Sequence, residues 1–182
     1  MMAWAMRETE GDVKAGDDTV RRPFEEVYCD LADIVFRFCV TQVGSLAVAE
    51  EVTAQTFAAA LAAYDRFQPS SDPRPWLLRI ARNAAIDHRR RTHRGTALLA
   101  RLSRFAGMRS SSIEELAEVR DDVRRVTIAI AALPTRDRQL VGLRLAAQLS
   151  FQEMALVTGR TPAAVRRATE RALRRLRQSM EA

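Results

Sequence analysis

Apolar residues recur at every third or fourth position over most of the chain, which is the period of an amphipathic helix. The first stripe consists of Phe24, Val27, Tyr28, Leu31, Ile34 and Phe38. Gly44 is expected to end this helix, and Ser45 to cap a second one that runs to about Phe67. Its expected core residues are Val52, Phe57, Leu61 and Tyr64.

Turn-forming residues at positions 68–73 predict a loop, after which Pro75 suits the first turn of a third helix. The apolar face of that helix contains Leu77, Ile80, Ala81 and Ala84. Its opposite face carries Arg79, Arg82, Asn83 and Arg90. Trp76 lies among the apolar positions, which favours a core role over a stacking platform for a base.

The composition changes at Thr92–Ser112, where glycine, serine and arginine predominate, and this predicts a linker with a short helix at Leu98–Phe105. The run Ser112-Ile-Glu-Glu115 is a capping box and opens a second helical domain. The first stripe of that domain is Leu116, Val119, Val123, Val126 and Ile130. Leu133-Pro134 breaks the helix, and a short helix through Leu140, Leu143 and Leu145 follows.

Two short helices around a tight turn are predicted near the C-terminus. Ser150 and Glu153 form a capping box, and Gly159 supplies the turn residue that tolerates a positive φ. Thr161 and Pro162 then suit the N-cap and first position of the next helix. The inward stripe of this helix is Val165, Ala168, Ala172 and Leu176. The arrangement is that of a helix-turn-helix that places its second helix in the DNA major groove.

The composition supports an all-α protein with two small helical domains joined by a flexible linker. Among the 182 residues 47% are hydrophobic and only 6% aromatic, with few glycines. The net charge of +6 is concentrated in Arg79–Arg94 and Arg160–Arg177, which indicates two contacts with a polyanion. Solvated helix faces are the alternative explanation of these charges.

Other chemistries find little support in the sequence. Cys29 and Cys39 are roughly 15 Å apart on one helix, too far for a disulfide, and are expected to be buried in a reducing cytoplasm. His88 and His93 lack partners at metal-ligand spacing, and no apolar run is long enough to span a membrane. We therefore expect no catalytic residue, metal, cofactor, small-molecule substrate or membrane insertion, and a cytoplasmic location.

The outward face of the last helix contains the candidate DNA contacts. They are Thr161, Ala163, Ala164, Arg166, Arg167, Glu170, Arg171, Arg174 and Arg175. Arg166, Arg167 and Glu170 are the candidates for reading bases, because the N-terminal turns of such a helix reach base edges. Their chemistry agrees, since arginine can bind guanine and glutamate can accept a hydrogen bond from cytosine. Arg171, Arg174 and Arg175 are better placed for phosphates. An ordinary arginine-rich amphipathic helix is the competing interpretation.

Both halves together resemble the extracytoplasmic-function group of sigma-70-type sigma factors, which direct bacterial RNA polymerase to promoters. The resemblance to the sigma-2 domain rests on 49–57, on Tyr64-Asp-Arg-Phe67 and on the run from Pro75 to Arg91 that contains Trp-Leu-Leu-Arg-Ile-Ala-Arg-Asn. The resemblance to sigma-4 rests on Leu133–Arg138, Leu149-Ser150 and the helix-turn-helix. Together these segments cover roughly 23–94 and 113–180.

The resemblance implies a role for each domain. The second helix of sigma-2 is expected to bind the β′ clamp helices of core polymerase through Glu51, Gln55, Phe57 and Asp65. The loop and third helix are expected to recognise and melt the −10 element. Their candidate residues are Gln68, Ser70, Ser71, Asp72, Arg79, Arg82, Asn83, Arg89, Arg90 and Arg91. Sigma-4 is expected to read the −35 element and to contact the β flap.

The predicted boundaries are 1–22 for a disordered tail, 23–94 for sigma-2, 95–112 for the linker and 113–182 for sigma-4. Family members are commonly held by an anti-sigma factor, so one is an expected partner. Three places depart from the family pattern: Ala54-Gln55 in sigma-2, and Ala163-Ala164 and Ala168 in the recognition helix. The alternative function is a stand-alone helix-turn-helix regulator with an N-terminal dimerisation or sensor domain.

Overall fold

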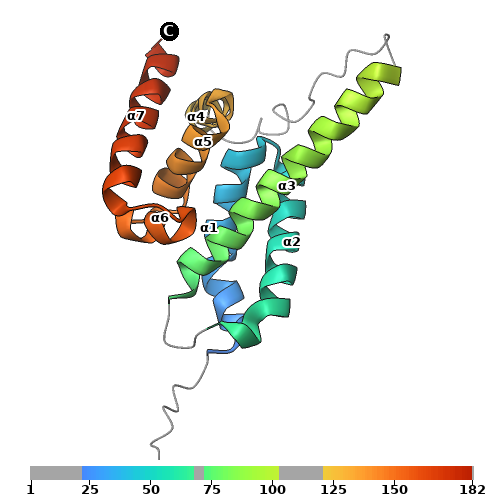
Figure 1. Cartoon of the computed structure of the whole chain (residues 1–182), viewed down its shortest axis with the longest axis vertical. Helices are drawn as coiled ribbons and strands as arrows, with labels where there is room; N and C mark the ends of the chain where they lie inside the picture. The colour runs from blue at the N-terminus through green and yellow to red at the C-terminus, as the bar shows by residue number, and fades with distance from the viewer. Residues whose placement is uncertain (1–21, 68–71, 103–120, 182) are drawn as a thin grey trace, which may run out of the picture.

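The computed structural model describes residues 22–67, 72–102 and 121–181, which contain helices and no strand. The elements are α1 (Phe24–Val43), α2 (Leu46–Ala63), the 3-10 turn η1 (Tyr64–Arg66), α3 (Pro73–Leu102), α4 (Asp121–Ala132), α5 (Thr135–Val141), the π-helical turn η3 (Gly142–Ala146), α6 (Phe151–Thr158) and α7 (Pro162–Glu181). Figure 1 shows α1, α2 and α3 as one bundle and α4 to α7 packed beside it. The all-α prediction is confirmed.

The boundary between α1 and α2 has the predicted chemistry. Gly44 adopts a left-handed conformation with φ of 74°, and its N–H donates to the carbonyl of Val40. The hydroxyl of Ser45 accepts a hydrogen bond from the N–H of Val48 at 3.5 Å. A glycine stop directly followed by a serine cap lets the chain reverse within two residues, so that α2 packs back on α1.

Two predicted core positions in this bundle are wrong, since Tyr28 is 50% exposed and Leu61 is 59% exposed. The ring of Tyr28 meets Phe57 edge-on at a centroid distance of 4.7 Å and leaves much of its own surface to solvent. Cys29 is exposed as well, whereas Cys39 is buried as predicted. Helical spacing marks the inward side of a helix, but neighbouring helices decide how far around it burial extends.

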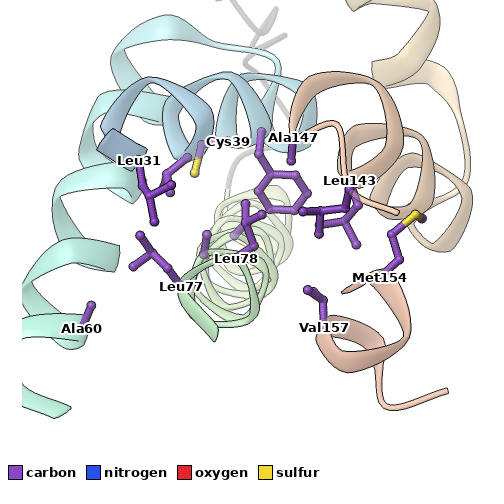
Figure 2. Packing of buried hydrophobic residues seen from close by; sticks show 14 of the residues in the cluster. Leu31, Cys39, Ala60, Leu77, Leu78, Leu143, Ala147, Met154 and Val157 are labelled. Atoms are coloured by element: carbon purple, nitrogen blue, oxygen red, sulfur yellow. The ribbon is translucent and has the colours of Figure 1, made fainter. Parts of the chain in front are cut away.

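Helix α3 is buried from two directions. Leu77 and Leu78 are adjacent in the sequence and both fully buried. Figure 2 shows Leu77 on the side of Leu31 and Ala60, and Leu78 toward Leu143. The ring of the half-buried Trp76 packs against the core and lies 4.7 Å from the ring of Phe67, as expected for a core residue.

Helix α3 extends beyond the predicted end of sigma-2. It continues to Leu102, eight residues past Arg94, and so occupies the first part of the segment predicted as a linker. The predicted short helix at 98–105 is continuous with α3 up to Leu102, and its last three residues lie outside the described residues. The helix can extend because its C-terminal part lacks proline, and its single glycine there, Gly95, is tolerated within a helix.

The C-terminal domain has a small core of its own. It consists of Ala129, Ile130, Leu133, Val141, Ala172 and Leu176. The break at Leu133-Pro134 is confirmed, since α4 ends at Ala132 and α5 begins at Thr135. Leu145 is 46% exposed, contrary to prediction, because the π-helical turn shifts its side chain away from the face that an α-helix would give it. The side chains of Leu116, Val119 and Val123 are outside the described residues.

A larger core joins the two domains. One cluster of buried side chains includes Val35, Phe38 and Leu78 from the first bundle together with Leu143 and Val157 from the second domain. Figure 2 shows Leu78, Leu143 and Val157 of this cluster between the helices. Helix α6 packs on α3, while α4, α5 and η3 pack on α1. The predicted sigma-2 and sigma-4 segments therefore pack against each other.

Candidate nucleic-acid interfaces

The helix-turn-helix has the predicted caps and turn. The hydroxyl of Ser150 accepts from the N–H of Glu153 at 3.2 Å, and the N–H of Ser150 donates to the Glu153 carboxylate at 2.7 Å. Gly159 is left-handed with φ of 67° and donates to the carbonyl of Ala155. The hydroxyl of Thr161 accepts from the N–H of Ala164 at 3.3 Å. These bonds fix the angle between α6 and α7.

The inward side of α7 differs from the predicted stripe at one position. Val165, Thr169, Ala172 and Leu176 are buried, whereas Ala168 is only half-buried. The hydroxyl of Thr169 donates to the carbonyl of Val165 at 2.9 Å, so a polar side chain is buried with its hydrogen bond made. Sequence reasoning missed Thr169 because it is polar, although its spacing of four residues from Val165 was a usable signal.

The outward side of α7 presents a nearly continuous cationic surface. The exposed residues are Thr161, Ala163, Arg166, Arg167, Glu170, Arg171, Arg174 and Arg175, and Ala164 is half-buried. Arg166 lies 4.0 Å from Glu170, one turn away. Arg175 makes an ion pair with Asp137 of α5, so it is held toward the domain. Exposed arginines on a helix whose N-terminus is free match the geometry of a major-groove helix.

The candidate −10 residues on α3 divide by exposure. Arg79, Asn83, Arg90 and Arg91 are exposed, whereas Arg82 and Arg89 are half-buried. Arg91 donates to the side chain of Gln55 at 3.4 Å and to the carbonyl of Asp87. Arg90 lies 4.0 Å from the Asp87 carboxylate, one turn away. The exposed members form a basic strip along α3.

Arg82 is directed into the contact between the two domains. Its Nε donates to Oε1 of Gln139 in α5 at 3.1 Å. Burial lowers the pKa of Arg82, and repulsion from the nearby Arg160 lowers it further. In this conformation Arg82 is a contact between the domains rather than part of the exposed basic strip.

The loop before α3 contributes one described residue. Asp72 is exposed, and its carboxylate accepts from the N–H of Arg74 at 2.9 Å, so it caps the start of α3. Gln68, Ser70 and Ser71 lie outside the described residues. A hollow of about 540 Å³ lies beside this cap. It is lined by Arg66, Phe67, Asp72, Pro75, Trp76, Arg79, Glu153 and Leu156.

Sequence reasoning missed this hollow because its walls come from both domains. Phe67 and Trp76 offer aromatic faces, and Arg66 and Arg79 offer guanidinium groups. Aromatic faces beside cations are the groups that hold an unstacked base and its phosphate. The arrangement suits single-stranded nucleic acid near the start of α3.

The candidate polymerase residues are partly at the surface. Glu51 and Gln55 lie one turn apart on α2, and the amide of Gln55 donates to the Glu51 carboxylate at 2.8 Å. Asp65 is exposed in η1. Phe57, by contrast, is only 5% exposed and packs edge-on against Phe24 and Tyr28. The structure therefore corrects the expectation for Phe57: it supports the surface from beneath instead of offering a side chain there.

Other kinds of site find no support among the described residues. No group of three or more His, Cys, Asp or Glu side chains in those ranges is arranged to hold a metal ion. Among their helices, none is long and apolar enough to cross a membrane.

Comparison with known proteins identifies both halves. Residues 27–95 match the family Sigma-70 region 2, and residues 124–176 match Sigma-70, region 4. The match of the first half to region 2 argues against a sensor or dimerisation domain there, and so against a stand-alone regulator. The chain is 30% identical over 173 residues to the ECF RNA polymerase sigma factor SigD of Mycobacterium tuberculosis, covering 92% of this chain and 80% of SigD. It is 27% identical to the sigma factor CarQ of Myxococcus xanthus, covering 88% and 91% of the two chains.

Solved structures share the fold. The sigma factor RpoE of Bartonella quintana, crystallised with the anti-sigma factor NepR, superposes with a TM-score of 0.71 at 19% identity, covering 87% of this chain and 97% of RpoE. CnrH, solved with the cytosolic domain of CnrY, superposes with a TM-score of 0.64 at 24% identity over 87% of each chain. With the two region matches and the likeness to SigD, these findings show that the chain belongs to the extracytoplasmic-function sigma factors of the sigma-70 family.

Proposed function

We propose that this protein binds core RNA polymerase and directs it to promoters by holding the DNA at two places, α7 on the −35 element and α3 on the −10 element. The observation that carries the proposal is the presence of two separate arginine-rich helices on one chain, in regions that match sigma-70 regions 2 and 4. The protein acts without catalytic residues of its own, and the polymerase carries out RNA synthesis. Its place of action is the cytoplasm, where the polymerase works.

In sigma-4, the N-terminal part of α7 reads bases and its later part binds phosphates. Arg166 and Arg167 are exposed within the first two turns, where a major-groove helix meets base edges. Arg171 and Arg174 lie one to two turns further along and hold the backbone. We propose 113–182 as the extent of sigma-4.

In sigma-2, spanning 23–94, α3 and the adjoining loop hold the melted strand. Separating a base step costs a few kcal/mol, which contacts with the displaced strand offset. Arg79, Asn83, Arg90 and Arg91 supply an exposed strip for phosphates and bases. The sigma-2 wall of the hollow, formed by the rings of Phe67 and Trp76 beside Arg79, accepts an unstacked base.

Core polymerase docks on α2. Glu51, Gln55 and Asp65 offer acidic and amide groups for the β′ clamp helices, with Phe57 packed beneath them. Sigma-4 contacts the β flap. An anti-sigma factor is a further partner, as RpoE and CnrH were each solved with a second protein, in RpoE's case a named anti-sigma factor.

The direct test adds purified protein to core polymerase and a pool of genomic promoter fragments, followed by mapping of transcript starts. We expect initiation at a small set of promoters that share one −35 and one −10 sequence. A protein that footprints DNA tightly by itself and yields no specific transcript with core polymerase would show that the proposal is wrong.

A further inference from the structure

A second hollow, of about 450 Å³, lies where α6 meets the start of α7. It is lined by Ser150, Phe151, Gln152, Pro162, Ala163 and Arg166. The first three residues are the cap and first turn of α6, and the last three belong to the first turns of α7. Figure 1 shows α6 meeting the N-terminal end of α7. The hollow is continuous with the exposed arginine face of α7, because Arg166 belongs to both.

Three of the lining side chains are apolar and held in place. Phe151 is half-buried and packs against the core, and the guanidinium carbon of Arg144 lies 5.2 Å from the centre of its ring. Pro162 and Ala163 are exposed, and neither side chain has rotamers to lose. The hollow therefore offers a preformed apolar surface, and binding to it costs little side-chain entropy.

The α6 side of the hollow is poorly suited to a phosphate. The N-terminus of a helix ordinarily attracts an anion, because its first N–H groups lack partners within the helix. Here the Glu153 carboxylate already accepts from the N–H of Ser150 at 2.7 Å, and the Ser150 hydroxyl accepts from the N–H of Glu153. A second negative charge would be repelled by this carboxylate.

The α7 side offers few donors either. The N–H of Ala164 donates to the Thr161 hydroxyl at 3.3 Å, and Pro162 has no N–H. Arg166 is the cation in the lining, and it lies 4.0 Å from the carboxylate of Glu170. The chemistry of the hollow therefore favours an apolar group over an anion.

The DNA major groove presents one apolar group to a recognition helix, the 5-methyl group of thymine. The first turns of such a helix lie against base edges. Ala163 is exposed on the first turn of α7, three and four positions before the exposed Arg166 and Arg167. Alanine and phenylalanine are among the side chains that contact thymine methyl groups.

We infer that this hollow binds the 5-methyl group of a thymine in the −35 element, and that Ala163, Pro162 and Phe151 select that base. The inference rests on the proposed function and adds a base to those read by the arginines of α7. Ala163 is one of the positions at which the chain departs from the family pattern, so the preference belongs to this chain's own residues.

The geometry also predicts where the thymine lies. Ala163 is four residues from Arg167, which is about 6 Å along the helix axis at about 1.5 Å per residue. Successive bases of a strand are about 3.4 Å apart. The thymine should therefore lie within about two base pairs of the position whose preference depends on Arg167.

The test removes the methyl group alone, by replacing thymine with uracil, which keeps the same hydrogen-bonding groups. Promoter fragments found by mapping transcript starts are synthesised with deoxyuridine in place of each −35 thymine in turn, on either strand. The full-length protein with core polymerase is assayed for binding to each fragment and for specific transcription. We expect a loss of affinity of about three- to five-fold at one position, the effect of leaving one methyl group unburied, and little change at the other thymines.

Two variants test whether the hollow causes this preference. Ala163→Gly removes a methyl group from its wall, and Ala163→Ser adds a hydroxyl there. Each should reduce the ratio of thymine to uracil affinity below about two-fold, and the serine variant remains informative if glycine loosens the first turn of α7. The matched control is Ala164→Gly, in the same turn but outside the lining, which should keep the wild-type ratio. Circular dichroism checks that each variant remains helical.

Equal affinity for thymine and uracil at every −35 position would overturn the inference. A methyl preference that survives in both Ala163 variants, or that Ala164→Gly abolishes as well, would contradict the assignment to the hollow. So would a methyl-sensitive thymine more than about two base pairs from the Arg167 position. Specific transcription from the unmodified fragments distinguishes these results from failure of the proposed function, which would give no specific start on any fragment.

Discussion

The two arginine-rich helices, α3 and α7, differ in how much of each is covered. Helix α7 buries one stripe and leaves the rest of its surface to solvent, with Arg166, Arg167 and Arg174 exposed. Helix α3 is covered on two sides, since adjacent Leu77 and Leu78 are both fully buried and Arg82 bonds to sigma-4. Two helices of similar composition therefore differ in exposure: α7 leaves its arginine face open to DNA, whereas α3 is partly covered by sigma-4.

The difference teaches that charge alone does not define a binding surface. Both helices satisfy the sequence criteria for a nucleic-acid contact. What separates them is a second packing partner, which comes from the other end of the chain. The predictions below test this contrast from the largest expected effect to the smallest.

The largest effect is expected from truncating the buried side of α3. Leu77→Ala should lower the free energy of unfolding by about 2–5 kcal/mol, because it leaves a cavity in a fully buried site. Denaturation in urea measures the loss. Leu156→Ala, at a site that is 67% exposed, is the matched control and should change stability by less than about 0.5 kcal/mol.

The neighbouring leucine sharpens the contrast. Leu78→Ala should be as harmful to stability as Leu77→Ala in the wild-type chain. It should be less harmful than Leu77→Ala in a Gly142→Leu protein, because a side chain at position 142 meets Thr41 and Phe38 of α1 and weakens the contact between the domains. The reason is that Leu78 faces Leu143 whereas Leu77 faces Leu31 and Ala60 (Figure 2). Equal losses of stability for both leucine variants in the Gly142→Leu protein would show that α3 is not covered from two directions.

On α7 the expected effects concern DNA. Arg167→Ala should weaken DNA binding by about 1–3 kcal/mol and relax the base preference at one −35 position. Arg174→Ala should weaken binding to all sequences alike and reduce the slope of log affinity against log salt concentration by about one. Binding is measured with a library of −35 sequences at several salt concentrations. If both variants change the same base preference, the division of α7 into base-reading and phosphate-binding parts is wrong.

A smaller effect is expected at the turns that flank α6, the helix between α3 and α7. Gln148 has φ of 54°, a left-handed conformation that glycine adopts more easily. Gln148→Gly should therefore raise stability by about 0.5–1 kcal/mol in thermal unfolding. Gly159→Ala is the opposite substitution. Gly159 has φ of 67° and open space around it, so an alanine there would meet no neighbour, and the strain of its backbone alone should lower stability by about 1 kcal/mol.

The smallest effect depends on pH. Partial burial by itself would raise the pKa of Glu153, but hydrogen bonds from Ser150 and Arg74 together lower it below the ordinary value. A lowered carboxyl pKa stabilises the folded chain above the ordinary glutamate pKa, and that contribution is lost as the pH falls through the lowered value. It should amount to less than about 1 kcal/mol.

The measurement for this prediction compares the free energy of unfolding in urea of the wild-type and Glu153→Gln proteins between about pH 6 and pH 3, a window around the ordinary glutamate pKa. The wild-type protein should lose stability in the acidic part of this range, and the two proteins should converge there. A constant difference between them at every pH would show that the Glu153 charge does not stabilise the fold.

Features determined within a few residues were predictable from the sequence. The stop at Gly44, the cap at Ser45, the capping box at Ser150 and the turn at Gly159 all follow from local backbone chemistry. The exposed arginines of α7 follow from its helical period. The family resemblance, confirmed by the region 2 and region 4 matches, rested on such local runs.

Features that depend on a distant partner were not predictable in this way. The exposure of Leu61 and the burial of Thr169 depend on which helices lie opposite and on a hydrogen bond to the backbone. The shared core between the domains joins residues about a hundred positions apart, such as Phe38 and Leu143. Because each domain shows a complete stripe of its own, periodicity cannot reveal that the two pack together.

The bare backbone at Gly142 has a consequence for genetics. A Cβ atom there would lie 2.5 Å from the Thr41 hydroxyl and 2.6 Å from the Gln42 amide of α1. Every missense single-nucleotide change in a glycine codon gives a larger residue, so each places a side chain where the α1 side chains already lie. A chain whose two domains no longer pack closely is therefore one point mutation away, and suppressors of such a change should map to the facing turn of α1 around Thr41.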